Sequence, residues 1–101
     1  MAQFTEREMT FEEACRGVAE RVAALVIAKQ ADYGHDNILG TGEVGLVVRV
    51  NDKIARLRNL VLNKKTPMNE TVRDTWVDVA GYAIIALMLA DGTFTRELGE
   101  A

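Results

Sequence analysis

The sequence runs Val79-Ala-Gly-Tyr-Ala-Ile-Ile-Ala-Leu-Met-Leu-Ala90 without a charged residue. This run is well short of the ~20 residues that a membrane-spanning helix requires, so it predicts a helix buried in protein and no membrane partner. Its second half is apolar on nearly every side of a helix, which therefore needs neighbours all round. We expect subunits to share this core in a homo-oligomer, a dimer or a tetramer.

The predicted helix extends from the apolar run in both directions. Asn69 is a plausible N-cap, and Glu70 would favour the positive end of the helix dipole. Asp91 and Gly92 end the helix, and the segment from Phe94 to Leu98 predicts one short C-terminal turn.

A first helix is expected upstream, from Thr10 to about Tyr33. Thr10 and Glu13 form a capping-box pattern, and Gly34 ends the helix. Apolar residues recur at three- and four-residue spacing along one stripe, which predicts a core that includes Cys15. The stripe consists of Phe11, Cys15, Val18, Val22 and Leu25.

The segment from Gly34 to Gly45 contains four glycines and no periodicity, which predicts a loop. The stripe Val47, Val50, Ile54, Leu57 and Val61 then predicts a second helix to about Asn63, and the residues from Lys64 to Pro67 break it. The expected fold is all-α, with three main helices plus a short C-terminal turn. It forms a single domain over residues 1–101, a helical bundle completed by oligomerisation.

Composition narrows the class of protein. A net charge of −3 with dispersed acids argues against a protein that coats a nucleic acid polymer, which needs a broad basic face. Cys15 is the only cysteine, so no intramolecular disulfide can form. The first nine residues lack the apolar core of a signal peptide, and a cytoplasmic protein is expected.

Three acids form a ridge on the expected third helix. Glu70, Asp74 and Asp78 are spaced four apart, so they share one face and repel one another. One interpretation is a solvated face partly paired with Arg73. The other is a Mg²⁺ site, because this ion prefers carboxylate oxygens and keeps several waters.

Three cations share a face of the second helix. Arg49, Lys53 and Arg56 either neutralise the acidic ridge across a helix pair or bind phosphate groups. Asp52 either joins a metal site or pairs with Arg56 along the helix. Together with the glycine-rich loop, these residues describe a pocket for a metal-bound polyphosphate.

Other residues that could belong to a binding site have simpler structural interpretations. Gly40-Thr-Gly-Glu-Val-Gly45 matches the dinucleotide-binding fingerprint by letter, but it follows a helix and not the required strand. His35 is the only histidine, which excludes a histidine-based metal site and predicts an exposed loop residue. Trp76 and Tyr82 are assigned to packing, whereas Tyr33 either packs or stacks on a base.

An ordered set of residues resembles a known family. The set reads Lys29-x-x-Asp32-Tyr33-Gly34-x-x-Asn37, Gly42-x-x-Gly45, Arg49-x-x-Asp52-Lys53-x-x-Arg56-Leu57 and Glu70-x-x-x-Asp74-x-x-x-Asp78-x-x-x-Tyr82. It resembles the nucleotide modification associated domain of bacteriophages and bacteria, over roughly Lys29 to Phe94. That domain is similar to the MazG-like all-alpha nucleoside triphosphate pyrophosphatases, which release a nucleoside monophosphate and pyrophosphate.

The resemblance implies roles for individual residues. Asp78 matches the aspartate of the MazG-type ExxD motif, whereas Asp74 stands one residue too early for its glutamate. The ExxE motif has no match, because Asp52 is the only acid on the second helix. Glu13, Glu20, Glu43 or a neighbouring subunit are the open candidates to complete the ligand shell.

As an enzyme, the chain would hold Mg²⁺ with Asp52, Asp74 and Asp78, and Glu70 would be a further ligand or the base. The cations Arg49, Lys53 and Arg56 would bind the leaving pyrophosphate, while Tyr33 and Asn37 would face the base or sugar. The predicted function is Mg²⁺-dependent pyrophosphohydrolysis of a deoxynucleotide or modified nucleotide. The alternatives are a phage protein that binds or sequesters nucleotides or nucleotide signals without cleaving them, and a structural helical subunit of a phage assembly.

Overall fold

The computed structural model describes residues 8–99. In this range the chain forms the helices α1 (Phe11–Tyr33), α2 (Asp36–Leu39), α3 (Gly42–Leu57) and α4 (Val72–Asp91), and the π-helix η1 (Arg58–Leu62) extends α3. No strand occurs between residues 8 and 99, so the all-α prediction is confirmed. None of the helices described is long and apolar enough to cross a membrane.

The first helix begins and ends where the sequence predicts. The hydroxyl of Thr10 accepts a hydrogen bond from the backbone N–H of Glu13 at 3.1 Å, and the Glu13 carboxylate accepts one from the Thr10 N–H at 3.0 Å. This reciprocal pair satisfies two N–H groups that a helix start would otherwise leave unbonded. Helix α1 ends before Gly34.

The predicted loop between Gly34 and Gly45 is wrong in part. It contains helix α2, and α3 begins at Gly42 and not near Val47. Gly42 has a φ of 62°, a left-handed conformation that glycine adopts readily. A Cβ at Gly45 would lie 1.8 Å from Oγ1 of Thr41. The glycines therefore permit a tight turn into a helix, whereas the sequence predicted a loop throughout this segment.

The start of α4 also differs from the prediction. Thr71, and not Asn69, is the N-cap, and it forms a second capping box with Asp74. The Thr71 hydroxyl accepts from the Asp74 N–H at 3.0 Å, and the Asp74 carboxylate accepts from the Thr71 N–H at 3.4 Å. Glu70 therefore precedes the helix, and the acidic ridge is interrupted. The helix ends at Gly92, and the Arg96 N–H donates to the Thr93 carbonyl in a short C-terminal turn.

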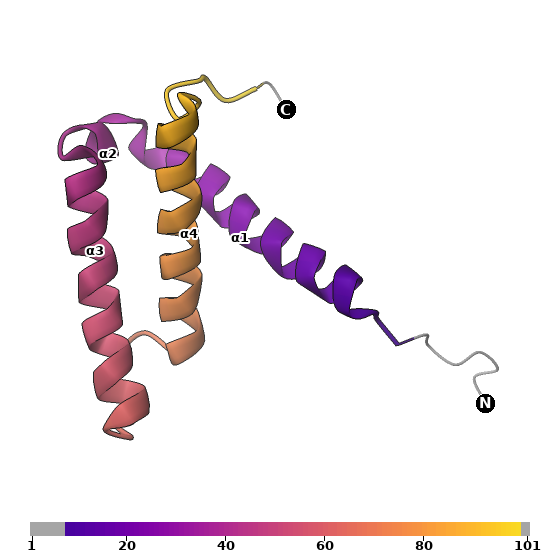
Figure 1. The fold of residues 1–101 in the computed structure, drawn as a ribbon, viewed down its shortest axis with the longest axis vertical. Coiled ribbons are helices and arrows are strands. Elements are labelled where there is room, and N and C mark those ends of the chain that lie inside the picture. Colours follow the sequence, from indigo (N-terminus) through magenta and orange to yellow (C-terminus); the bar gives the residue numbers. More distant parts are fainter. Residues whose placement is uncertain (1–7, 100–101) are drawn as a thin grey trace.

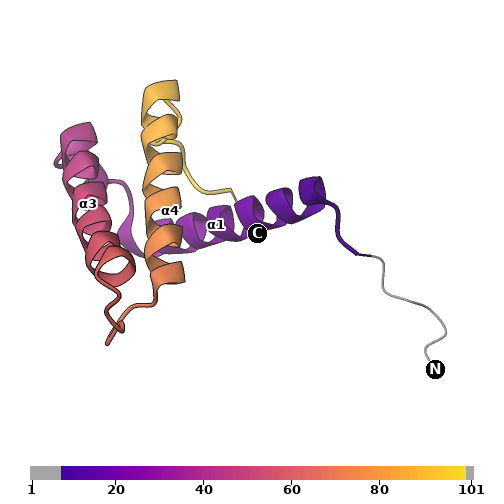
Figure 2. The same cartoon turned by 60° about the horizontal axis from the view of Figure 1, so that its bottom comes forward.

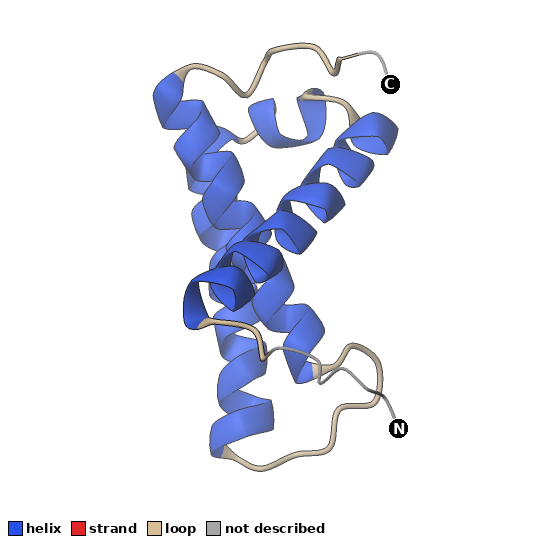
Figure 3. Ribbon diagram, turned by 90° about the vertical axis from the view of Figure 1, so that its right-hand side faces the viewer, coloured by secondary structure: helices blue, strands red, loops and turns tan. Residues whose placement is uncertain are grey.

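Helices α3 and α4 lie side by side and antiparallel, while α1 projects away from them (Figures 1 and 2). Seen from the side, α1 crosses the α3–α4 pair at a steep angle (Figure 3). The most buried apolar side chains come from several elements, and Phe94 of the C-terminal turn joins them. They are Val22, Ile38, Leu46, Leu57, Leu60 and Phe94.

The predicted buried face of α3 is confirmed in its middle, where Leu57 is buried and Val50 and Ile54 are half-buried, but it is wrong at its two ends. Val47 and Val61 are 63% and 50% exposed, whereas Leu46 and Leu60, one residue earlier in each case, are buried. One residue corresponds to about 100° around a helix. The half-buried Lys53 lies on the side of α3 that faces α4, where its acidic partner Asp78 lies.

Helix α1 buries little of its apolar stripe. Val22 is only 6% exposed, but Phe11 is 83% exposed and Val18 is 46% exposed. Cys15 is exposed, so its assignment to the core is wrong. The radius of gyration is 17.0 Å, against about 13 Å expected for a compact chain of this length. This open arrangement favours a partner along α1, and the homo-oligomer stays a prediction.

Candidate functional site

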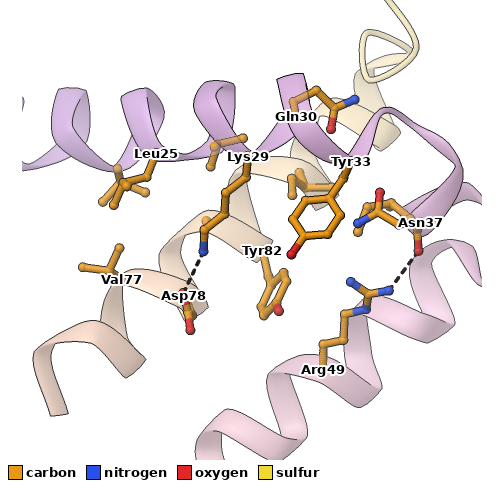
Figure 4. Close-up of a pocket in the computed structure, with 14 residues that line it drawn as sticks. Leu25, Lys29, Gln30, Tyr33, Asn37, Arg49, Val77, Asp78 and Tyr82 are labelled. Atoms are coloured by element: carbon orange, nitrogen blue, oxygen red, sulfur yellow. Dashed lines mark hydrogen bonds and ion pairs between the residues drawn. The ribbon is translucent and has the colours of Figure 1, made fainter. Parts of the chain in front are cut away.

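A cavity of about 330 Å³ lies where α1 crosses α4, next to α2 and the first half of α3. Its apolar wall comes mainly from valine and leucine side chains of α1 and α4. Its polar side chains come from all four helices (Figure 4). They are Lys29, Gln30, Tyr33, Asn37, Arg49, Asp78 and Tyr82. An apolar cavity with a few converging polar groups is the usual composition of a small-molecule site.

Helices α1 and α4 approach each other closely at Gly81. A Cβ on this residue would lie 3.4 Å from Cγ2 of Val26 on α1. Gly81 also lines the cavity, and its missing side chain leaves part of the space open.

Asp78 links three helices at one edge of the cavity. Its Oδ2 lies 2.8 Å from Nζ of Lys53 on α3, and its Oδ1 lies 3.5 Å from Nζ of Lys29 on α1. The Asp78 side chain is 19% exposed, whereas that of Lys29 is 59% exposed. The short pair with Lys53 is therefore the better shielded one. Figure 4 shows the longer contact, between Lys29 and Asp78.

The Lys53 ammonium also belongs to a second cluster of polar side chains, which includes Glu70, Arg56 and Thr75. It lies 3.0 Å from Oε1 of Glu70, whose other oxygen is 3.4 Å from Nε of Arg56. Thr75 is 0% exposed, and its hydroxyl accepts from Arg56 Nε at 3.1 Å and lies 2.5 Å from Oε2 of Glu70. Arg56 also donates to the backbone carbonyl of Glu70. This cluster ties the segment before α4 to α3.

These contacts shift the pKa values of two groups. The hydrogen bond from Thr75, followed by that from Lys53, lowers the pKa of Glu70 below its ordinary value. The hydrogen bond to Asp78 raises the pKa of Lys53, Glu70 acts in the same direction, and burial opposes both. Both groups are therefore held in their charged forms.

The three predicted phosphate-binding cations have different surroundings. Lys53 and Arg56 pair with acids, as expected if the cations neutralise acidic residues across the helix pair. Arg49 lines the cavity, and its Nη2 donates to the backbone carbonyl of Asn37 at 2.9 Å (Figure 4). Of the three, Arg49 is the one that could reach a ligand in the cavity.

The predicted metal ligands are not brought together within the described chain. Asp52 is exposed on α3, Asp74 caps α4 and Asp78 faces two lysines. Among residues 8–99, no group of three or more His, Cys, Asp or Glu side chains is arranged to hold a metal ion. Asp52, Asp74 and Asp78 therefore do not form such a group within the described residues, and the binding of Mg²⁺ stays a prediction.

The predicted base-binding or sugar-binding residues Tyr33 and Asn37 both line the cavity. Tyr33 is 65% exposed, whereas the Asn37 side-chain oxygen is buried without a hydrogen-bond partner among residues 8–99. Tyr82 was assigned to packing, and it both packs against the core and lines the cavity. Lys29 was missed as a site residue, although its i, i+4 spacing to Tyr33 places both on one face of α1.

Two assignments of other residues require correction. His35 is half-buried, where an exposed loop residue was expected: its ring contacts Phe94 edge-on at 5.4 Å, and its Nδ1 is hydrogen-bonded to Gln30. Trp76, expected in the core, is 54% exposed. Trp76 lies next to Val18 and Val72 on a shallow apolar hollow of α1 and α4.

The fold and cavity thus define a small helical protein with a mixed aromatic and cationic pocket. The family model for nucleotide modification associated domain 1 matches residues 29–89, and the chain belongs to this family. The match begins at Lys29 and includes the cavity residues of α2, α3 and α4. No curated protein and no solved structure matches the chain.

Proposed function

We propose that this protein binds a nucleotide in the cavity between α1 and α4. One observation carries the proposal: two tyrosines, two cations and Asn37, whose buried amide oxygen has no hydrogen-bond partner among residues 8–99, line a single cavity in a member of a nucleotide-associated family. Aromatic faces suit a base, cations suit a phosphate, and a buried acceptor requires a donor.

Each group has a chemical role in this proposal. The ring of Tyr33 or Tyr82 stacks on the base, which buries apolar surface on both partners. The Asn37 oxygen accepts a hydrogen bond from a base amine or a sugar hydroxyl. Lys29 and Arg49 bind phosphate oxygens, and Arg49 can do so through the guanidinium nitrogens that do not contact the Asn37 carbonyl.

Mg²⁺-dependent pyrophosphohydrolysis of a deoxynucleotide or modified nucleotide is the second candidate. Its support is the position of Asp78, the residue that resembles the ExxD aspartate, on the cavity wall. The competing observation is that Asp78 and Glu70 are neutralised by lysine and arginine within the described chain. Hydrolysis would therefore require carboxylates from a second copy or a rearranged network, whereas capture of a nucleotide or nucleotide signal requires neither.

Calorimetric titration with a panel of nucleotides tests the proposal. Wild-type protein is expected to bind at least one nucleotide, and Tyr82→Leu, which keeps an apolar side chain but loses the aromatic face, should weaken that binding. Trp76→Leu is the matched control, because Trp76 lies outside the cavity. Equal loss in both variants, or no binding by wild type, would contradict the proposal. Chromatography of the incubated nucleotide with Mg²⁺ then distinguishes cleavage from capture.

A further inference from the structure

We infer that the cavity selects a nucleotide with a single phosphate group over the corresponding triphosphate. This inference rests on the proposed function and specifies its ligand class. It follows from the charges that face the cavity and from the contacts that hold the neighbouring cations away from it.

The charged side chains lining the cavity in the described chain are Lys29, Arg49 and Asp78. Two positive charges and one negative charge give a net charge of +1. A phosphate monoester carries about −1.5 to −2 charges near pH 7. The net charge of the lining therefore offsets about half to two-thirds of the charge of one phosphate and leaves nothing for a second or third.

Lys29 can serve one phosphate without leaving Asp78 unpaired. Its ammonium is 3.5 Å from Asp78 and the side chain is 59% exposed, so it can turn toward a ligand at small cost. Asp78 then keeps its shorter 2.8 Å contact with Lys53. One phosphate at Lys29 and Arg49 thus replaces a weak ion pair and leaves the strong one intact.

Lys53 and Arg56, the neighbouring cations of α3, cannot turn toward a phosphate in the way that Lys29 can. Lys53 bridges Asp78 and Glu70, and Arg56 contacts Glu70 and the fully buried Thr75. Turning either toward a second or third phosphate would leave a shielded carboxylate or hydroxyl without its partner, which is unfavourable. Additional phosphates would also approach the negative charge of Asp78.

The test is calorimetric titration with adenosine, guanosine, cytidine and thymidine nucleotides, each as the 5′-monophosphate and the 5′-triphosphate, in EDTA and in Mg²⁺. For the base that binds, the monophosphate should bind more tightly than the triphosphate in both buffers. Lys29→Ala should weaken monophosphate binding about tenfold, as expected for loss of a hydrogen bond to a charged group. Lys65→Ala, an exposed cation outside the cavity, should leave it unchanged.

Asp78→Asn provides a second variant that keeps the side-chain shape and removes the negative charge. It should shift the ratio of affinities toward the triphosphate by severalfold relative to wild type. A triphosphate that binds wild type as tightly as the monophosphate or more tightly, in either buffer, overturns the inference and leaves nucleotide binding standing. Failure of all eight nucleotides to bind would instead contradict the proposed function, and with it the inference.

Discussion

Nζ of Lys53 lies 2.8 Å from Oδ2 of Asp78, so the central cation of α3 is bonded to the acid that α4 presents at the cavity edge. The same ammonium also contacts Glu70 before α4 begins. Lys53 therefore holds two acids in place, and its removal should affect both the stability of the helix pair and the geometry of the cavity.

Lys53→Met should lower the free energy of unfolding by about 1–2 kcal/mol, between the values for exposed and buried ion pairs. Both carboxylates lose a partner, while the apolar stem is retained. For a chain of this size, about 1 kcal/mol corresponds to a fall of roughly 4–8 °C in melting temperature. Differential scanning calorimetry of wild type, Lys53→Met and Lys65→Met measures the melting temperatures. Lys65→Met is the control, because Lys65 is exposed. Equal melting temperatures for the two variants would show that the Lys53 contacts contribute nothing.

Thr75→Val should destabilise the fold by about 1–3 kcal/mol, because a buried hydroxyl that bonds Arg56 and Glu70 is replaced by a methyl group of similar size. Thr75→Ser keeps the hydroxyl and is the control for lost hydrogen bonding. Urea unfolding of both variants gives the comparison. A serine variant that is the less stable of the two would show that the methyl group, and not the hydroxyl, matters at this position.

The stability of the network should depend on pH at both extremes. The folded pKa of Glu70 is lowered from 4.5, so its contribution is complete above that pH and is lost as the pH falls through the folded value. The folded pKa of Lys53 is raised from 10.5, so its contribution is complete below that pH and is lost as the pH rises through the folded value.

Urea unfolding of wild type and Glu70→Gln at a series of pH values below and above 4.5 tests the acid limb. The variant should start less stable at neutral pH, and the difference from wild type should shrink in acid. A constant difference across this range would mean that Glu70 titrates alike in the folded and unfolded chains.

Gly81→Leu should abolish binding of nucleotide to the cavity, because the added side chain occupies space between α4 and Val26 of α1. Gly81→Ala is the matched control, since its Cβ would make an ordinary van der Waals contact at 3.4 Å. Calorimetric titration of both variants with the nucleotide that binds wild type measures the effect, with circular dichroism to verify helix content. Undiminished binding by the leucine variant would place the ligand elsewhere.

The exposed apolar side chains of α1 should be covered in solution by a second copy of the chain. Light scattering should therefore give the mass of a dimer or tetramer, and Val18→Lys should reduce that mass by placing a charge on the apolar hollow. A wild-type mass of 11.1 kDa at micromolar concentration would contradict this prediction.

Local signals in the sequence predicted local structure well. The capping box at Thr10 depends on residues three apart, and its partner Glu13 is visible in the sequence. The start of α4 is ambiguous in the sequence, because Asn69 and Thr71 are both good cap residues, and the capping box between Thr71 and Asp74 decides between them. The face of α3 was predictable only in part. Leu57 is buried as expected, but Leu46, Val47 and Val48 are consecutive, so apolar periodicity does not specify which of them is buried.

The candidate site was predictable only in part. Tyr33 and Asn37 were identified through the family resemblance, and both line the cavity. Lys29 and Tyr82 join them because α1 crosses α4 at Gly81, a tertiary contact without a local sequence signal. The pairing of Lys53 and Arg56 with acids was one of two open alternatives, and the geometry of the helix pair was needed to choose between them.

Each of the two helices that enclose most of the cavity starts with its own capping box, so part of what stabilises each one is local. The cavity itself exists only while those helices cross. In a denaturant titration, ligand affinity should consequently disappear at lower concentration than the far-ultraviolet helix signal. Helicity alone would then be a poor criterion for a functional preparation of this protein, and recovery of the ligand-competent fraction would be the better one.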